Sequence, residues 1–460
     1  MTYFSRRLPP LLALLCLLSL LSLLTACVAP GATGQSGKSS QTGAGTASPT
    51  AASQSGAMAT PASASSIDKC PQELSQVIGC MTPQAIRTAY GVQPLLDKGF
   101  TGKGQTVIDI VSFGSPTLRQ DMQVFDRQFG LPATDMQIIS PLNEPEYDPN
   151  KDKDGWAGET TLDVQIIHAI APEAKIVVLV SPVAETEGTI GLPEFRQLIQ
   201  YAIDHKLGNI VSQSWGASEL TLENAQGQQE MQKWNPLLQK ATTQQGITFF
   251  SSSGDHGATD FMDMQSRHLG SVPTTGFASD SPWVTSVGGT TLVRNGSTFS
   301  ERVWNDKTDA ASGGGFSRFY SMPDYQKTLP ATTQQQFQNR RGVPDVSAVA
   351  DPDTGLAFYQ GGAWSLAGGT SASAPLWAGI MAIADQMAGR PLGFIDPALY
   401  KLAGSGTYTE DFHDITVGDN TNHAARVTGY QATTGWDAAT GLGTPDAEHL
   451  IPDMIAAMKS

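Results

Sequence analysis

The sequence predicts an α/β protein with a doubly wound, mainly parallel sheet that is flanked by helices and forms a single domain. Short apolar runs without alternation recur along the chain, and such runs are typical of strands buried on both faces. They cover residues 106–113, 174–180, 209–214, 247–253 and 283–287. Stretches with amphipathic helical spacing separate them, of which 159–170 and 193–205 are the clearest. In such sheets, functional groups gather beyond the carboxyl ends of the strands.

The overall composition is that of a globular protein, with 40% hydrophobic residues and a formal net charge of −15 at pH 7 among 460 residues. This charge argues against nucleic acid as a partner, because no basic patch is available to replace the phosphate counterions. An acidic surface also suits a protein that works below neutral pH, where carboxylates become neutral. Ordinary acidic proteins share this composition, so charge alone decides little.

Residues 1–26 are predicted to be an export signal. Arg6 and Arg7 precede a leucine-rich run that is too short and too poorly flanked for a spanning helix. The run ends in LTAC at 24–27, which resembles a bacterial lipobox, whose cysteine becomes the lipidated first residue. We therefore expect an exported lipoprotein that Cys27 anchors to the outer face of the bacterial cell membrane, unless it is shed to the medium. A plain cleaved signal with an incidental cysteine is the alternative.

Two further segments are expected before the folded domain. Residues 27–66 are almost wholly Ala, Gly, Ser, Thr, Gln and Pro, which is too little apolar surface to offset chain entropy, so a disordered tether is predicted. The short segment 67–81 contains Cys70 and Cys80, which could form a disulfide in an oxidising setting; two free thiols are the alternative. The folded domain is expected over 82–460.

The strongest local pattern is GGTSASAP at 368–375, followed by the apolar helical run 376–387. The glycines permit a tight turn, which would place Ser371 at a helix N-terminus. The positive end of the helix dipole favours a developing alkoxide or oxyanion there. A serine that only caps a buried helix is the alternative. The complete string resembles the nucleophile motif of the subtilase clan.

A histidine base is not predicted, because no His precedes Gly-Thr and the strand 106–113 lacks an Asp-Ser/Thr-Gly signature. Instead, Glu159 and Asp163 stand four residues apart and would share one face of a helix. Two carboxyl groups so close resist double ionisation, so the pKa of one should rise. A carboxylate in that state could serve as a base for a serine hydroxyl. Two solvated acids on an exposed helix face are the alternative.

A third acidic position, Asp255, directly follows the predicted strand 247–253 and lies between Gly254 and Gly257. A protonated carboxyl at a strand's carboxyl end could donate a hydrogen bond to a developing oxyanion, whereas an ionised one would repel it. An Asx turn is the alternative.

The chain resembles the sedolisin family of serine-carboxyl peptidases in three motifs and in their order. These motifs are E-x-x-x-D at 159–163, SGD at 253–255 and GTSASAP at 369–375. The resemblance runs from residue 82 to near residue 446 and implies a subtilisin-like fold. It implies that Ser371 is the nucleophile, that Glu159 takes its proton and that Asp163 orients Glu159. Asp255 would be the oxyanion donor. The residues implied to line the substrate cleft are Trp215, Gly216, Ser253 and Gly254.

The resemblance also implies one structural Ca²⁺ ion near the C-terminus. The implied ligands are the carboxylates of Asp414 and Asp437 and the carbonyls of Ile415, Thr433 and Gly435. Hard oxygen ligands of this kind select calcium over zinc or copper. The family usually has glycine where this chain has Thr433, so a backbone conformation with positive φ would be strained there.

The activity implied by the resemblance is hydrolysis of peptide bonds in acid. A glutamate base in place of histidine moves the working pH toward carboxylate pKa values. We expect an endopeptidase that acts as a monomer on protein or peptide substrates. A tripeptidyl-peptidase with the same mechanism and a catalytically silent binding lipoprotein are the alternatives.

Overall fold

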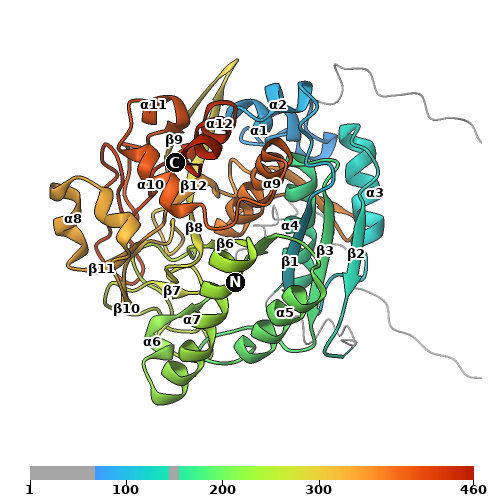
Figure 1. Ribbon diagram of the computed structural model, residues 1–460. Helices are drawn as coiled ribbons and strands as arrows, with labels where there is room; N and C mark the ends of the chain where they lie inside the picture. Colours follow the sequence, from blue (N-terminus) through green and yellow to red (C-terminus); the bar gives the residue numbers. More distant parts are fainter. Residues whose placement is uncertain (1–67, 144–154, 460) are drawn as a thin grey trace, which may run out of the picture. The chain divides into compact units, whose positions relative to one another are not determined.

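The centre of the computed structural model, which describes residues 68–143 and 155–459, is an eight-stranded sheet (Figure 1). Its strands are β1 (Thr106–Ser112), β2 (Met136–Ile139), β3 (Lys175–Ser181), β4 (Ile210–Gln213), β6 (Thr248–Ser252), β8 (Thr285–Asn295), β9 (Thr298–Val303) and β12 (Val346–Val349). The strand order is β12-β8-β6-β4-β1-β3-β2, and β9 pairs with β8. All neighbours are parallel except β8 and β9. The predicted fold class is confirmed.

The predicted strand positions agree with the central strands but miss the edges. The five apolar runs correspond to β1, β3, β4, β6 and β8, and β8 starts two residues later than predicted and continues to Asn295. The central strands β4 and β6 are buried throughout, as expected for strands covered on both faces. The edge strand β2 is partly exposed and only four residues long, so its sequence carries no comparable apolar run.

Helices flank the sheet. Helix α9 (Thr370–Ala388) packs against β4, β6, β8 and β12 and also against α4 (Trp156–Ile170), beside which it lies in Figure 1. Helix α5 (Leu192–His205) contacts β3 and α7 (Ala225–Gln245). The remaining helices are α1 (Pro83–Ala89), α2 (Gln93–Asp97), α3 (Leu118–Phe129), α6 (Glu219–Leu222), α8 (Ala331–Phe337), α10 (Asp396–Ala403), α11 (Tyr408–Asp411) and α12 (Ala447–Ala457), with 3₁₀ turns Gln72–Leu74 and Asp324–Thr328.

Four small antiparallel sheets complete the fold. Each is a pair of short strands: β5 (Ala217–Ser218) with β7 (Gly276–Phe277), β10 (Gly315–Ser321) with β11 (Arg340–Val343), β13 (Ala357–Gln360) with β14 (Ala363–Leu366), and β15 (Phe412–His413) with β16 (Thr444–Pro445). The first pair joins the chain after β4 to the chain after β6, and both of these segments contribute to the site described below.

Helix α4 is buried on every side, which corrects the expectation of an amphipathic helix over 159–170. Every residue of α4 is buried, including its carboxylates and its histidine. Glu159 is 4% exposed and Asp163 is 0% exposed, so the alternative of two solvated acids is wrong. Buried carboxyl groups are costly unless neighbouring groups compensate them. Their presence in a core helix therefore points to a functional arrangement.

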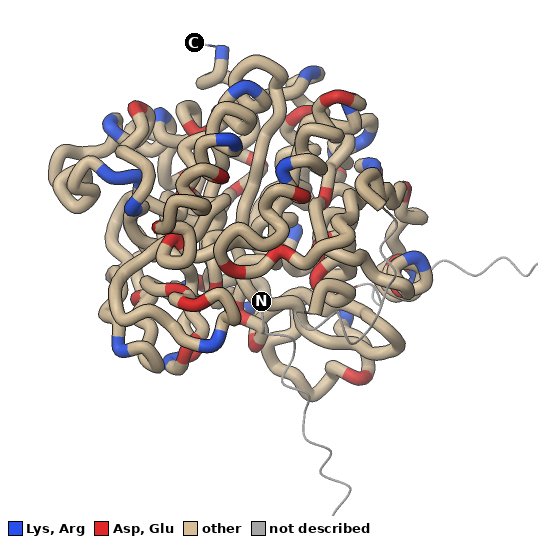
Figure 2. The backbone as a smooth tube through the Cα atoms, turned by 90° about the horizontal axis from the view of Figure 1, so that it is seen from below, with Lys and Arg blue, Asp and Glu red and all other residues tan. Residues whose placement is uncertain are grey.

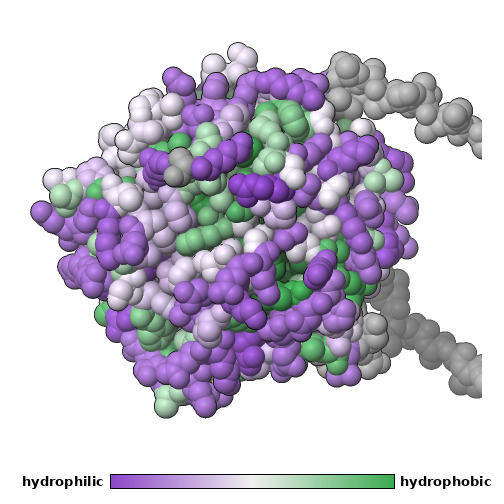
Figure 3. Space-filling view, viewed as in Figure 1, coloured by the Kyte–Doolittle hydropathy of each residue, from purple (hydrophilic) through white to green (hydrophobic). Residues whose placement is uncertain are grey.

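The surface of the described chain is polar and carries both charges. Figure 2 shows Lys and Arg positions scattered among the acidic ones instead of gathered in one patch. In Figure 3 the surface is mostly hydrophilic, with apolar side chains gathered near the centre and at the lower right. Among residues 68–143 and 155–459, no helix has the length and apolar character needed to cross a membrane.

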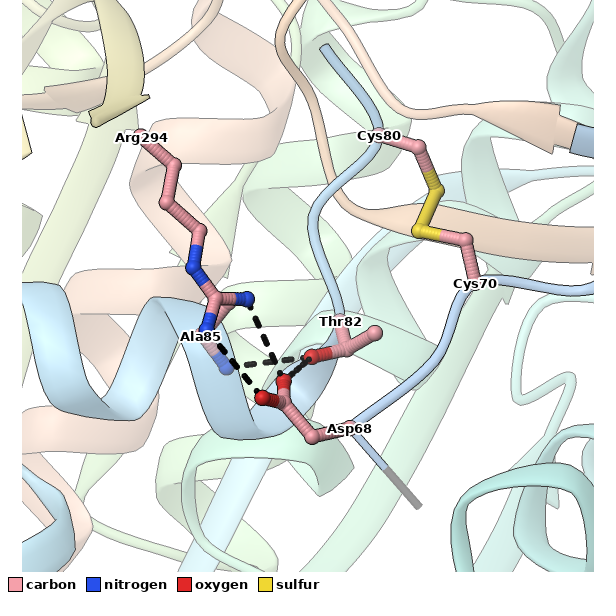
Figure 4. Close-up of a disulfide and its surroundings, with 6 residues drawn as sticks. All are labelled: Asp68, Cys70, Cys80, Thr82, Ala85 and Arg294. Carbon is pink, nitrogen blue, oxygen red and sulfur yellow. Dashed lines mark hydrogen bonds and ion pairs between the residues drawn. A yellow bond between two sulfur atoms is a disulfide. The ribbon is translucent and has the colours of Figure 1, made fainter. Parts of the chain in front are cut away.

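A disulfide closes a loop within the segment before α1, and polar contacts attach this segment to the domain (Figure 4). Cys70 and Cys80 are bonded, with an S–S distance of 2.02 Å. Asp68 accepts a hydrogen bond from the Thr82 hydroxyl at 2.8 Å and pairs with Arg294 at 3.2 Å. The export signal, Cys27 and the tether over 27–66 lie outside the described residues.

Replacing both Cys70 and Cys80 by serine is expected to lower the free energy of unfolding by about 3 kcal/mol, because the bond restricts the unfolded chain. Urea unfolding of both proteins without reductant measures this difference. A loss below about 1 kcal/mol would contradict the prediction and would show that the Asp68 contacts already hold the segment.

Candidate active site

The serine predicted as nucleophile lies at the start of the buried helix α9. Ser371 is the second residue of the helix, and Gly369 immediately precedes the helix with a φ of 80°. A Cβ atom at position 369 would lie 2.7 Å from Asp255 Oδ2, so a larger residue would displace that carboxyl group. Glycine is therefore needed for its backbone conformation and for the close approach of Asp255.

Asp255 is held against the same helix start. It follows β6 through Gly254, whose φ of 107° turns the chain toward α9. Asp255 Oδ1 accepts hydrogen bonds from the Thr370 main-chain N–H at 2.8 Å and from the Thr370 hydroxyl at 2.9 Å. Two donors thus fix Oδ1, and Oδ2 is the oxygen left to carry a proton.

Glu159 approaches Ser371 from the first turn of α4. The Ser371 hydroxyl lies next to the Glu159 carboxyl and lowers its pKa. Burial acts in the opposite direction and is stronger, and with the neighbouring charges of Asp255 and Asp109 it raises that pKa to about 8. This group is a stronger base than an exposed glutamate, and it touches the hydroxyl that would need to lose its proton.

Asp163 lies one helical turn further along α4. Its Oδ1 accepts a hydrogen bond from the Ser214 hydroxyl at 2.8 Å, and the same hydroxyl contacts the Ser371 carbonyl at 3.3 Å. Burial, and then the charges of Asp109 and Glu159, raise the pKa of Asp163. Asp163 and Ser214 therefore connect the base on α4 to the nucleophile on α9.

The residue that the sequence analysis missed is Asp109, in the middle of β1. It is 0% exposed, and a hydrogen bond joins its side chain to Asp163. Among the described residues, no donor N–H or O–H reaches either carboxylate oxygen of Asp109 or Asp163 Oδ2, so the bond requires a proton on one of the two acids. Burial raises the pKa of Asp109 to about 7. The signal that could have revealed it is an acid inside an apolar strand.

Asp109→Val is expected to lower kcat for peptide hydrolysis at acid pH about tenfold or more, because it removes the shared proton from Asp163. Asp109→Asn should retain most of the activity, since the asparagine amide can donate a hydrogen bond to Asp163. The measurement is kcat for both variants across the acid range, with thermal unfolding as a folding control. Equal losses in the two variants would contradict a positioning role for Asp109.

The four residues predicted to line the substrate cleft border one pocket together with Ser371 and Asp255. Trp215, Gly216, Ser253 and Gly254 all lie in its wall. Trp215 is only 1% exposed, and its ring packs between Phe195 at 4.9 Å and Trp234 at 5.9 Å. Residues that the sequence analysis did not single out also line this pocket, among them Glu187, His256, Asp260 and Phe261.

The predicted calcium ligands lie in two loops that contact each other. The Gly435 N–H donates to both carboxylate oxygens of Asp414, at 3.2 and 3.0 Å, and the Thr433 N–H donates to Asp437 Oδ2 at 3.0 Å. Neither carboxylate forms an ion pair with a described Lys, Arg or His. Thr433 is not among the described residues with positive φ, so the strain expected there is absent.

Comparison with known proteins supports the same family. The sequence model of the Subtilase family matches residues 150–392, more than half of the chain. Kumamolisin from Bacillus sp. (strain MN-32) is 34% identical over 391 residues, covering 81% of this chain and 63% of kumamolisin. Sedolisin from Pseudomonas sp. (strain 101) is 32% identical over 355 residues, covering 75% of this chain and 57% of sedolisin. Human tripeptidyl-peptidase 1 is 28% identical over 397 residues, covering 82% of this chain and 64% of the enzyme.

The chain thus spans less than two thirds of the length of these relatives. Among solved structures, Pseudomonas sedolisin, a serine-carboxyl proteinase complexed with two molecules of pseudo-iodotyrostatin, superimposes with a TM-score of 0.69 at 28% identity. That match covers 81% of this chain and 97% of the sedolisin chain. With the helix-borne Glu159 next to Ser371, these likenesses show that the chain belongs to the subtilase family, in its sedolisin branch.

Proposed function

We propose that this protein is an acid-active serine-carboxyl peptidase that hydrolyses peptide bonds of proteins. The observation that carries the proposal is the position of the buried Glu159 carboxyl next to the Ser371 hydroxyl, beside a pocket that Ser371 and Asp255 both line. A serine is a weak nucleophile until an adjacent base accepts its proton. The raised pKa of Glu159 supplies such a base without a histidine.

The reaction then follows from these positions. Ser371 Oγ attacks the carbonyl carbon of the substrate while its proton passes to Glu159. Glu159 next protonates the leaving amine, and in the second half of the reaction it accepts a proton from the water that hydrolyses the acyl-enzyme. Because Glu159, Asp163 and Asp109 lie together in the core, protons held by the two aspartates reduce the negative charge around Glu159 and so favour the ionised form that can accept the proton of Ser371.

Asp255 stabilises the negative charge that develops on the substrate carbonyl oxygen. Its Oδ1 is held by Thr370, and a proton on Oδ2 can be donated toward the pocket. An ionised Asp255 would repel the same oxygen. The protonated carboxyl is therefore the form of Asp255 that can act as the donor.

The test of the proposal is hydrolysis of an internally quenched peptide with a blocked N-terminus from about pH 2.5 to pH 7.5. Cleavage in acid that disappears in Ser371→Ala supports a serine-carboxyl endopeptidase. Tripeptide release that needs a free N-terminus would favour a tripeptidyl-peptidase. Folded protein that cleaves no peptide would favour a binding lipoprotein, and activity that peaks near pH 8 and survives Glu159→Gln would contradict the assigned base.

A structural Ca²⁺ ion is part of the proposal. Asp414 and Asp437, with the carbonyls of Ile415, Thr433 and Gly435, supply only hard oxygen donors from two contacting loops. A bound ion would balance the two carboxylates and hold the loops together. Its role would be structural, because the proton transfers described above require only the chain's own side chains.

Removal of calcium by EGTA is expected to lower the melting temperature by several degrees, since a ligand at a hundred times its Kd contributes about 3 kcal/mol of stability. Differential scanning calorimetry with and without calcium measures the effect. In Asp414→Asn the melting temperature should no longer respond to calcium. The same melting temperature for the unchanged protein with EGTA and with calcium would contradict the assignment.

We also propose that the peptidase is exported and lipid-anchored through Cys27. The leucine-rich run and the LTAC sequence at 24–27 support this location. The composition of residues 27–66 would then let the domain act away from the membrane surface.

A further inference from the structure

We propose that the pocket beside Ser371 binds the cationic side chain of a substrate lysine or arginine through the carboxyl groups of Glu187 and Asp260. This lysine or arginine is the residue on the acyl side of the cleaved peptide bond. The inference rests on the proposed peptidase function and adds the class of substrate. Neither acid takes part in the proton transfers described above.

Both acids lie in the wall of the same pocket as the nucleophile, although they come from different loops. Glu187 belongs to the loop between β3 and α5, and Asp260 follows β6. A Cβ atom at Gly276 would stand only 3.5 Å from Asp260 Oδ2. The glycine therefore adds no side chain to the wall of the pocket beside that carboxyl group.

Each of the two carboxyl groups has one oxygen fixed by the protein. Glu187 Oε2 accepts hydrogen bonds from the Ser218 N–H and the Thr221 hydroxyl, both at 2.9 Å. Asp260 Oδ1 accepts the Phe261 N–H at 2.8 Å. No hydrogen bond from a described residue reaches the other oxygen of either group, and neither group forms an ion pair with a described cationic side chain. Two positioned oxygens thus remain for a ligand.

The charges around these acids favour a cation. Burial, and then the charge of Asp260, raise the pKa of Glu187 to about 8. Burial also raises the pKa of Asp260, with a small further rise from Asp255, while the positive charge of His256 lowers it. Two adjacent buried acids are costly in the ionised form, and His256 offsets this cost only in part, because burial still raises the pKa of Asp260. A lysine ammonium or arginine guanidinium in the pocket would supply a further counter-charge.

The position and walls of the pocket identify which substrate group would enter it. Because Ser371 and Asp255 line the same pocket, the group closest to Glu187 and Asp260 belongs to the residue whose carbonyl is attacked. Phe261, Phe277 and Trp215 contribute apolar wall beside the acids. Lysine and arginine carry a methylene stem below the charge, so they match an apolar wall that ends in carboxyl groups.

The two acids should make the substrate preference depend on pH. In strong acid the two carboxyl groups are protonated and attract a cation only weakly. As the pH rises toward their pKa values they ionise more readily, and a bound cation promotes this ionisation. The preference for a cationic side chain over a neutral one should therefore increase with pH.

The experiment compares two N-terminally blocked peptides that differ only at the residue before the cleaved bond, lysine in one and norleucine in the other. The ratio of their kcat/KM values is measured from about pH 3.5 to pH 6.5 with the full chain. Ionisation of Glu159 in the free enzyme affects both peptides equally and cancels in the ratio. We expect a ratio of about ten or more that rises with pH.

The variants test whether the two acids cause the preference. In Glu187→Gln and in Asp260→Asn the ratio should fall toward one and lose its pH dependence. The matched control is Asp263→Asn, which alters an acid that pairs with His268 in the same loop as Asp260 and should leave the ratio unchanged.

Four results would overturn the inference. A ratio near one at every pH in the unchanged enzyme, or a ratio that survives both substitutions, would refute the cation pocket while the peptidase function stands. Cleavage that requires an unblocked N-terminus and releases tripeptides would mean that the acids bind the terminal amine instead. Failure to hydrolyse any peptide would overturn the proposed function, and this inference with it.

Discussion

Glu159→Gln is expected to lower kcat for peptide hydrolysis by about ten-thousandfold or more, the range found when one member of a catalytic serine–base unit is removed. Glutamine retains the size of the side chain and its place in the first turn of α4, but it cannot take the proton of Ser371. The loss should therefore fall on kcat much more than on KM. Steady-state kinetics at the acid optimum, with Ser371→Ala as the matched inactive control, measure the effect.

The same substitution should affect stability in the opposite direction at neutral pH. Burial raises the pKa of Glu159 from 4.5 to about 8, so the folded protein holds a proton there that the unfolded chain releases. The stability associated with this group is present below about pH 4.5 and is lost as the pH rises toward 8. Glutamine does not ionise, so the variant should unfold at a higher temperature than the unchanged protein at neutral pH.

A combination of lost activity and neutral-pH stabilisation separates a catalytic role from a folding defect. Glu159→Gln protein that retains more than about a tenth of the activity would rule out Glu159 as the base. A variant with lower stability at all pH values would instead point to a structural role for the carboxyl group.

Asp255→Ala is expected to lower kcat by about a hundredfold to a thousandfold, the effect of removing one donor from an oxyanion site. The substrate should still bind, because the other walls of the pocket remain, so KM should change little. The measurement is kcat and KM at the acid optimum, with circular dichroism to show that the fold is intact.

Asp255→Asn is the informative comparison. Since Thr370 holds Oδ1 of Asp255, an asparagine would keep its oxygen in that position and direct its amide group toward the pocket. The amide can donate a hydrogen bond without titrating. This variant should lose less activity than Asp255→Ala. An equal loss in the two variants would contradict the role of Asp255 as a hydrogen-bond donor.

The fold class could be predicted from the sequence because it depends on local patterns. The apolar runs at β1, β3, β4 and β6 show no alternation, and this pattern requires a strand that is covered on both faces. The glycines before Ser371 and the four-residue spacing of Glu159 and Asp163 are equally local. Each of these patterns restricts the chain over a few residues, so each could be interpreted without knowledge of distant contacts.

The edges of the sheet and the burial of α4 could not be predicted in the same way. The spacing of apolar residues in α4 suggested one exposed face, but α9 and the sheet cover the helix from several sides. Burial depends on which elements pack together, and that information is absent from the helix's own sequence. The same burial is the main cause of the raised pKa values of Glu159 and Asp163.

The sequence by itself determined the α/β class, the serine at the start of a helix and the acids on one helix face. Only the tertiary structure placed Asp109 of β1 next to Asp163, and Glu187 in the same pocket as Asp260. These pairs join residues more than fifty positions apart, and their separation in space depends on strand order and helix packing. Local propensity specifies the elements, whereas the ionisation of a buried acid depends on the neighbours that packing brings to it.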